Sequence, residues 1–230
     1  MASTSSSNPA IQEILDFWFG MNPKDWFVGG PSQDKIITER FSHLVEKARL
    51  TNELDKPWMS TPSGSLALVL LLDQFTRNIY RVGNHPEPGL SFSGDAKALR
   101  VASEAIARGH DRRMQQENAS KMLMGLPFRY FFYMPFMHAE DLAAQVACGA
   151  LFEVMKKEFA VLEQERLAEG RDETEDEKAA EEVVNAGFDF AKKHLNCILS
   201  VGRFPKRNEP LGRTPGQADE EWLEKYPKGF

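Results

Sequence analysis

Five polar side chains gather at the end of an otherwise apolar stretch of the sequence. Asp73, Arg77 and Arg81 are spaced four residues apart, and Gln74 and Asn78 repeat that spacing beside them. Residues four apart share one face of a helix, so both sets should point to the same side. Burial without partners would cost several kcal/mol per group. The segment therefore predicts either a ladder of Asp–Arg pairs or part of a ligand site, and both interpretations stay open.

A second polar segment runs from Tyr133 to Gln145. If this segment is helical, His138, Asp141 and Gln145 share one face near a helix start, where the helix dipole favours anions. Histidine is suited to proton transfer near neutral pH, and a neighbouring carboxylate such as Asp141 can fix its tautomer. Tyr133 and Glu140 of this segment would line the same ligand pocket. A single histidine in this setting can equally be structural.

A third polar segment combines His194 with the loop that follows its helix. The loop carries Arg203, Arg207 and Asn208. Guanidinium groups bind carboxylates and phosphates through two parallel hydrogen bonds, so these arginines, with those of the first segment, could hold an anionic ligand. The alternative is that the arginines pair with carboxylates of the chain itself, namely Asp73, Asp95, Glu140 and Asp141.

Sequence signatures of cofactor and metal sites are missing. The chain has no glycine-rich phosphate loop, no dinucleotide-binding fingerprint, no serine-hydrolase elbow and no H-E-x-x-H zinc motif. A metal site would need His138 and His194 together with Glu140 or Asp141 from another helix. We therefore expect neither a metal nor a cofactor.

Helices must position these three segments. The run Leu66–Leu72 is apolar on every side, which predicts a central buried helix rather than a strand. Because no segment alternates with a period of two, little or no sheet is expected. Periodicity, capping residues, prolines and glycines predict the remaining helices, over residues 9–20, 31–51, 95–108, 117–134, 136 to beyond 159, 189–199 and 219–226. In the long helix after Pro135, Leu142, Val146, Leu151 and Met155 should face inward.

Composition predicts one cytoplasmic all-α domain over residues 9–230, preceded by a disordered tail over residues 1–8. Hydrophobic residues make up 42% and charged residues 27%, and no apolar run is long enough to span a membrane. The two cysteines favour a reducing compartment. Ten acidic and three basic residues lie within 162–182, so the rest of the chain is nearly neutral and lacks the basic face that nucleic acid requires. This acidic insertion should be a solvated helical hairpin or a mobile loop that acts as a spacer.

Three motifs, in the same order along the chain, resemble the family catalogued as domain of unknown function 924. They are Leu71–Phe75 with Arg77 and Asn78, Pro135–His138 with Glu140, Asp141 and Gln145, and Gly202–Pro205 with Arg207, Asn208 and Leu211–Arg213. The resemblance runs from about Ile11 to Trp222. It implies antiparallel helix pairs, similar to a tetratricopeptide-like superhelix, and no established activity. Lys206 stands where the family usually has His, and Ala139 stands where Ser is common.

The leading functional hypothesis is a cofactor-independent enzyme that does acid–base chemistry, of lyase, isomerase or cyclase type, on a small anionic organic molecule. His138 would be the acid or base, Asp141 its orienter and His194 a second proton-transfer group. Asp73, Arg77 and Arg203 would complete the pocket. Two alternatives remain: a non-catalytic module that binds a peptide or a small anionic ligand, and a network that only stabilises the fold. The sequence does not predict an oligomeric state.

Overall fold

The computed structural model describes residues 8–81, 83 and 85–227, and these residues form helices and turns without a single strand. The expected all-α class is therefore confirmed for the described part of the chain. By their internal contacts, the described residues form two compact units that divide between His110 and Asp111. Except for Asn8, the tail expected over residues 1–8 lies outside the described residues. The interpretation of residues 9–230 as one domain, and the tetratricopeptide-like arrangement, stay predictions.

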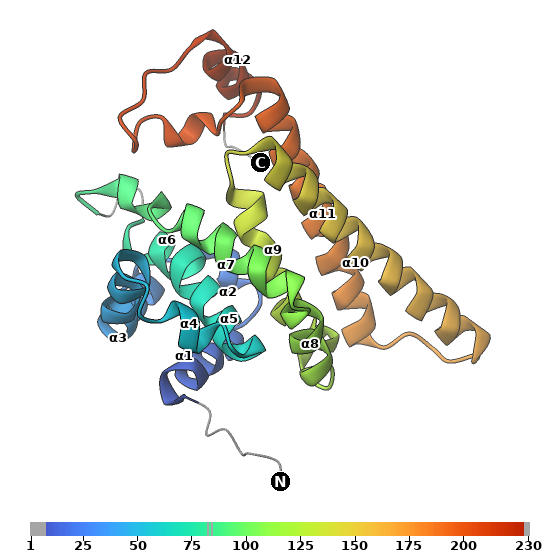
Figure 1. The fold of residues 1–230 in the computed structure, drawn as a ribbon. Coiled ribbons are helices and arrows are strands. Elements are labelled where there is room, and N and C mark those ends of the chain that lie inside the picture. Colours follow the sequence, from blue (N-terminus) through green and yellow to red (C-terminus); the bar gives the residue numbers. More distant parts are fainter. Residues whose placement is uncertain (1–7, 82, 84, 228–230) are drawn as a thin grey trace. The chain divides into compact units, whose positions relative to one another are not determined.

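Short helices build the amino-terminal unit (Figure 1). Local signals set several of their ends: the Asn8 side chain accepts a hydrogen bond from Ala10 N–H, and prolines occupy the first turns at Pro9, Pro31 and Pro62. In chain order the elements are α1 (Pro9–Phe19), α2 (Asp25–Val28), α3 (Pro31–Leu50), α4 (Asp55–Trp58), α5 (Pro62–Val69), the π-helix η1 (Leu70–Phe75), α6 (Thr76–Ile79), the 3₁₀ turn η2 (Pro88–Phe92) and α7 (Asp95–Ala107).

The predicted buried helix is the core of this unit. Every residue from Leu66 to Leu72 has no exposed surface, which confirms the expectation from its leucine content. The helix widens into a π-turn over η1, and the Thr76 hydroxyl donates to the carbonyl oxygen of Leu71 at 2.9 Å, five residues earlier. Gly94, just before α7, lies so close to the Leu72 carbonyl that a side chain there would clash. Backbone packing against the π-turn therefore requires a glycine at this position.

The carboxy-terminal unit is built around longer helices. Its elements are α8 (His110–Glu117), whose first residue belongs to the amino-terminal unit, the 3₁₀ turn η3 (Met122–Gly125), α9 (Leu126–His138), α10 (Leu142–Ala168), α11 (Glu175–Val201), the 3₁₀ turn η4 (Pro205–Arg207) and α12 (Gln217–Lys225). The helices α10 and α11 run side by side as an antiparallel hairpin, gold and orange in Figure 1. None of the described helices combines the length and the apolar character that a membrane span requires.

Two expected helix boundaries in this unit are wrong. The helix predicted over residues 117–134 is interrupted at η3, where Leu123 and Met124 take left-handed backbone angles (φ 53° and 55°). The break expected at Pro135 does not occur, because this proline lies inside α9. Almost every side chain of α9 is buried, and this packing outweighs the cost of an internal proline, about 3 kcal/mol. The chain leaves the helix only after His138.

The acidic segment forms the far end of the α10–α11 hairpin, as one of the two sequence interpretations predicted. A reciprocal capping box between Thr174 and Glu177 starts α11. In the same first turn, the Asp176 carboxylate accepts hydrogen bonds from the backbone N–H groups of Leu123 (2.7 Å) and Met124 (3.1 Å). The segment therefore does more than connect two helices, because it holds the left-handed turn at η3 in place.

Candidate functional site

In the amino-terminal unit, Arg77 joins two carboxylates. Its guanidinium lies 2.9 Å from the fully buried Asp73 and 2.9 Å from Asp95 at the start of α7. Burial opposes the charge of Arg77, but the two carboxylates outweigh it and hold its pKa above the ordinary value for arginine. The Gln74 amide also donates to Asp73. These contacts are the ones that the Asp–Arg ladder predicts.

Arg81 does not continue that ladder. Helix α6 ends at Ile79, so the expected position of Arg81 on the face of Asp73 and Arg77 is wrong. Instead, Arg81 binds Asp34 of α3 through Nε (2.5 Å) and Nη2 (2.8 Å), and Asn78 donates to the same carboxylate at 2.9 Å. Sequence spacing does not reveal Asp34, because its partners lie more than forty residues away along the chain.

In the carboxy-terminal unit, the second polar segment forms the junction between two helices rather than one helix face. His138 is the last residue of α9, whereas Asp141 caps α10 by accepting a hydrogen bond from Ala144 N–H at 2.7 Å. The expected shared face of His138, Asp141 and Gln145 is therefore wrong. The Asp141 carboxylate serves as a helix cap, and its role in orienting His138 stays a prediction.

Gln145 closes the end of α9 from the side of α10. Its buried amide nitrogen donates to the carbonyl oxygens of Phe136 (3.1 Å), Met137 (2.7 Å) and Ala139 (2.8 Å). The last carbonyls of a helix lack partners within the helix, so a side-chain donor stabilises the helix end. The predicted ligand-lining residue Gln145 thus fixes the backbone on both sides of His138.

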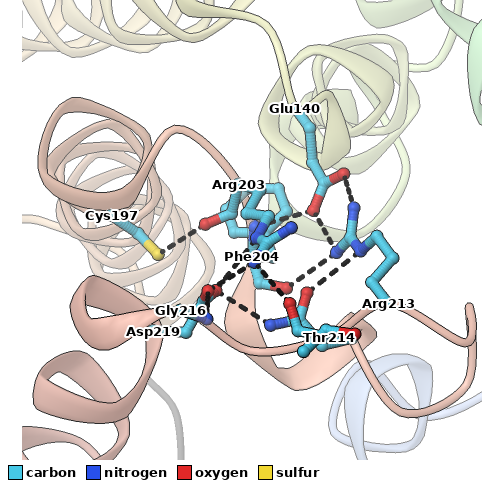
Figure 2. Close-up of polar contacts among 9 residues, drawn as sticks. Glu140, Cys197, Arg203, Phe204, Arg213, Thr214, Gly216 and Asp219 are labelled. Carbon is cyan, nitrogen blue, oxygen red and sulfur yellow. Dashed lines mark hydrogen bonds and ion pairs between the residues drawn. The ribbon is translucent and has the colours of Figure 1, made fainter.

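Glu140 ties this junction to the loop after α11 (Figure 2). Its carboxylate accepts hydrogen bonds from Arg213 Nη1 (2.6 Å), from Arg213 Nη2 (2.9 Å) and from the backbone N–H of Phe204 (2.7 Å). Burial alone would raise the pKa of Glu140, but the Arg213 guanidinium, the Phe204 N–H and the nearby charge of Arg207 hold it below 4.5. Glu140 therefore acts as a structural anchor, and Arg213 is its partner.

Asp219 at the start of α12 organises the same loop from the other side. It accepts hydrogen bonds from Arg203 at 3.0 and 2.5 Å, from Asn208 at 2.9 Å and from the backbone of Gly216 at 2.8 Å. The hydrogen bonding from Arg203 is the main reason that the pKa of Asp219 falls well below its ordinary value. Arg203 and Asn208, both predicted to bind a ligand, thus hold an internal carboxylate. Asp219 was not among the predicted site residues, although its position three residues after Gly216 is a capping signal.

Two histidines meet beside this loop. The rings of His138 and His194 have centroids 6.3 Å apart, and the edge of the Phe204 ring packs against His194 at 5.4 Å. Arg207 Nη2 donates to the carbonyl oxygen of His138 at 2.8 Å, and its guanidinium lies 4.8 Å from the centre of the Phe204 ring. Both histidines are half-buried. The expectation that these distant segments come together is confirmed for His138, His194 and Arg207.

The geometry assigns a tautomer to His194. Its Nδ1 lies 2.8 Å from the carbonyl oxygen of Phe190, one turn earlier in α11. A carbonyl oxygen only accepts hydrogen bonds, so Nδ1 must carry the hydrogen. In the neutral ring, Nε2 is then the basic nitrogen.

Tyr133 belongs to a separate buried network. Its hydroxyl accepts a hydrogen bond from Arg129 Nε at 2.6 Å and donates to Asp111 at 2.9 Å. Burial raises the pKa of Tyr133 well above 10. Arg129 continues to Glu158 of α10 at 2.5 Å and to Gln115 of α8 at 3.1 Å, so the network joins α8, α9 and α10. These contacts give Tyr133 a structural role in place of the predicted contact with a ligand.

The described residues contain no group of three histidine, cysteine or acidic side chains placed to hold a metal ion. Both cysteines are buried, and burial raises the pKa of each thiol to about 12. Neither thiol is therefore poised as a nucleophile at neutral pH. Asp73 and Arg77 belong to the amino-terminal unit and the histidine pair to the other, and a pocket shared by the two sets stays a prediction.

The sequence matches the family described as "Bacterial protein of unknown function (DUF924)" over residues 14–226. The chain belongs to this family. The fold is also similar to a solved structure, that of a protein of unknown function from Agrobacterium tumefaciens, which is 30% identical and has a TM-score of 0.69. The alignment covers 94% of this chain and 97% of that one. No curated protein sequence matches the chain. This match confirms the resemblance to the DUF924 family that the three sequence motifs indicated.

Proposed function

We propose that this DUF924 protein is a cofactor-independent enzyme that does acid–base chemistry, of lyase, isomerase or cyclase type, on a small anionic organic molecule. The observation that carries the proposal is the His138–His194 pair, whose ring centroids are 6.3 Å apart although 56 residues separate them in the sequence. Two imidazoles at this distance can flank the reacting part of a small substrate. One ring then removes a proton and the other ring returns it.

The assignment of roles follows from the hydrogen bonds of each ring. Because Phe190 fixes the hydrogen on Nδ1 of His194, we assign Nε2 of His194 as the general base. His138 is then the general acid. Arg207, which donates to the backbone carbonyl of His138 and lies over the Phe204 ring, would attract a carboxylate or phosphate of the substrate.

The surrounding ion pairs make the histidine geometry rigid. Glu140, two residues after His138, holds the backbone of Phe204, whose ring contacts His194. The Gln145 amide holds the carbonyls on both sides of His138. Preorganisation of this kind is what proton-transfer catalysis requires, since the groups must not reorganise during the reaction.

Proton abstraction can be tested without knowledge of the natural substrate. The protein is incubated in deuterated water with a panel of small carboxylates and phosphate esters, and NMR follows deuterium incorporation at the carbon next to the activating group. We expect His194→Gln and His138→Gln to lower the exchange rate of any active compound by about a hundredfold or more. His43→Gln, an exposed histidine of α3, is the matched control. Exchange that is unchanged in both site variants would contradict the proposal.

A second candidate function is a non-catalytic module, which is favoured because ion pairs remove Arg77, Arg81 and Arg203 from the predicted substrate clamp. Each of these arginines, predicted as part of an anion clamp, already binds a carboxylate of the chain. In this case, a thermal-shift screen with the same compounds should show stabilisation that depends on Arg207 but not on the two histidines. Loss of stabilisation in His194→Gln, together with loss of exchange, would favour the enzyme.

A further inference from the structure

Helix α10 is apolar on two opposite faces. Its inner face packs Cys148, Phe152 and Met155 into the unit, all essentially without exposed surface. Five large apolar residues lie outside this face: Leu142 is 47% exposed, Val146 55%, Val154 43%, Val161 51% and Leu167 61%. A face of this kind is unusual for a helix in contact only with water. Leu142 and Val146 belong to this exposed face, so the prediction that they face inward is wrong.

The exposed residues form one continuous stripe. Successive residues of an α-helix turn by about 100°, which places Leu142, Val146, Val154, Val161 and Leu167 within roughly one third of the circumference, opposite the buried face. Gly149 and Ala150 lie in the same stripe, and the turns beyond them add Ala160 and Ala168. Because α10 has 27 residues, the stripe is about 40 Å long.

Only one pair of charged residues interrupts this stripe. Glu153 and Lys157 lie one turn apart near its centre, with their charged atoms 3.5 Å from each other and with 42% and 76% of their side chains exposed. The pair is placed almost symmetrically about Met155, the middle residue of the helix. A second helix running in the opposite direction across this centre would therefore meet each charge with its opposite.

Gly149 adds an independent observation. A glycine in the interior of a helix lowers helix stability relative to alanine. At Gly187 of α11 the reason lies within the chain, since an added Cβ would come within 2.5 Å of the Phe152 ring. At Gly149 an added Cβ would meet no atom of the chain within 4 Å. The space next to Gly149 suits the close approach of a second helix.

We propose that the outer face of α10 binds the same face of a second copy of this chain, with the two helices antiparallel and the two-fold axis beside Met155. This arrangement brings the following residues of the two copies opposite one another: Glu153 and Lys157, Gly149 and Val161, and Leu142 and Ala168. Each pair matches opposite charges or combines a small residue with a large one. Such an isologous contact is the commonest type in homodimers.

The self-complementary charges favour a second copy over an unrelated partner. In an isologous antiparallel contact, one Glu153–Lys157 pair occurs on each side of the axis, so no charge is left unmatched. The stripe also carries no other charged side chain between Leu142 and Val161. A basic or acidic partner would therefore find no net charge on this face to recognise.

The oligomeric state of the full chain tests the proposal. Analytical ultracentrifugation over the micromolar range should show a monomer–dimer equilibrium. Val146→Glu places a charge in the apolar seam and should weaken association by about tenfold or more. Leu199→Glu on α11, where the leucine is 60% exposed, is the matched control and should leave association unchanged. A chain that stays monomeric, or a dimer unaffected by Val146→Glu, would overturn the proposal.

Charge reversal tests the antiparallel register. Glu153→Lys alone places lysines opposite each other in the dimer, and Lys157→Glu alone places glutamates opposite each other, so each variant should associate less than the parent chain. An equimolar mixture of the two variants restores both opposite-charge pairs and should form a heterodimer. Far-UV circular dichroism checks that each variant is folded. If the mixture associates no better than its components, the proposed register is wrong.

Discussion

The contact between Glu140 and Arg213 gives the sharpest test of how the loop after α11 is held. Glu140→Ala removes the acceptor of two Arg213 hydrogen bonds and of the Phe204 N–H. Hydrogen bonds to charged groups contribute about 1.5–3 kcal/mol each. The Glu140 and Arg213 side chains are 22% and 24% exposed, so solvent screening reduces the summed contribution of these hydrogen bonds. We therefore expect Glu140→Ala to lower the free energy of unfolding by about 2–3 kcal/mol.

A double-mutant cycle isolates the part that belongs to the ion pair. Glu140→Ala, Arg213→Ala and the double variant are compared by urea unfolding, followed by far-UV circular dichroism. Because the two side chains share two hydrogen bonds, we expect a coupling energy of about 1–2 kcal/mol. Arg213→Lys, which keeps the charge but loses the two-pronged geometry, should recover about half of the coupling. A coupling below about 0.5 kcal/mol would refute the idea that this pair anchors the loop.

The same pair predicts how stability depends on pH. The folded state holds the pKa of Glu140 below its ordinary value of 4.5. The carboxylate therefore contributes its full stabilisation at pH values above 4.5, and this contribution is lost as the pH falls through the lower folded pKa. The stability difference between the parent chain and Glu140→Gln should be largest near neutral pH and should shrink under acidic conditions. A difference that grows on acidification would contradict the assignment.

Three further changes test other parts of the structure by the same unfolding measurement. Gly187→Ala forces the Phe152 ring to move and should cost about 1–2 kcal/mol, and a stabilised variant would show that the helix contact is looser than described. Asp176→Ala removes two backbone hydrogen bonds and should cost about 1–2 kcal/mol, whereas its neighbour Glu175→Ala should change stability by less than about 0.5 kcal/mol. Arg77→Ala leaves the buried Asp73 without its cation and should cost about 3–5 kcal/mol, and a loss below about 1 kcal/mol would remove its structural role.

Local signals in the sequence predicted several helix ends to within two residues. The Asn8 cap and Gly20 bound α1, Pro31 starts α3, and Gly109 follows α7. At these positions, the residue that ends the helix lies next to the end itself. The leucine run predicted the buried helix for a similar reason, since a segment that is apolar on all sides has only the interior to occupy.

The region between α8 and α10 could not be predicted in the same way. Helix α9 is buried on nearly every side, so its sequence has no periodicity that marks its ends. The start of α9 depends on Asp176, more than fifty residues away, and its end depends on Gln145 of the next helix. The sequence identified Gln145 as an unusual polar residue, but its bonds to three carbonyls became visible only in the fold.

The sequence predicted only part of the candidate site, again because some partners lie on distant elements of the chain. The sequence selected His138, His194 and Arg207, and these residues do come together. It also treated the arginines as one group, although most of them pair with carboxylates on other elements. Asp34 and Asp219 supply those carboxylates, and neither lies near its arginine partner in the sequence. Spacing within one helix cannot reveal a partner that another helix provides.

Because of the π-turn at η1, the number of residues in the central helix is linked to the direction in which the following side chains point. A π-turn holds more residues than an α-turn, so it can be regarded as a regular helix with one inserted residue. If the same residues formed a regular α-helix without the widened turn, everything after them would be rotated by about 100°. Arg77 would then turn away from Asp95. Relatives that lack one residue in this segment should therefore form a regular α-helix there and keep the ion-pair arrangement that follows it.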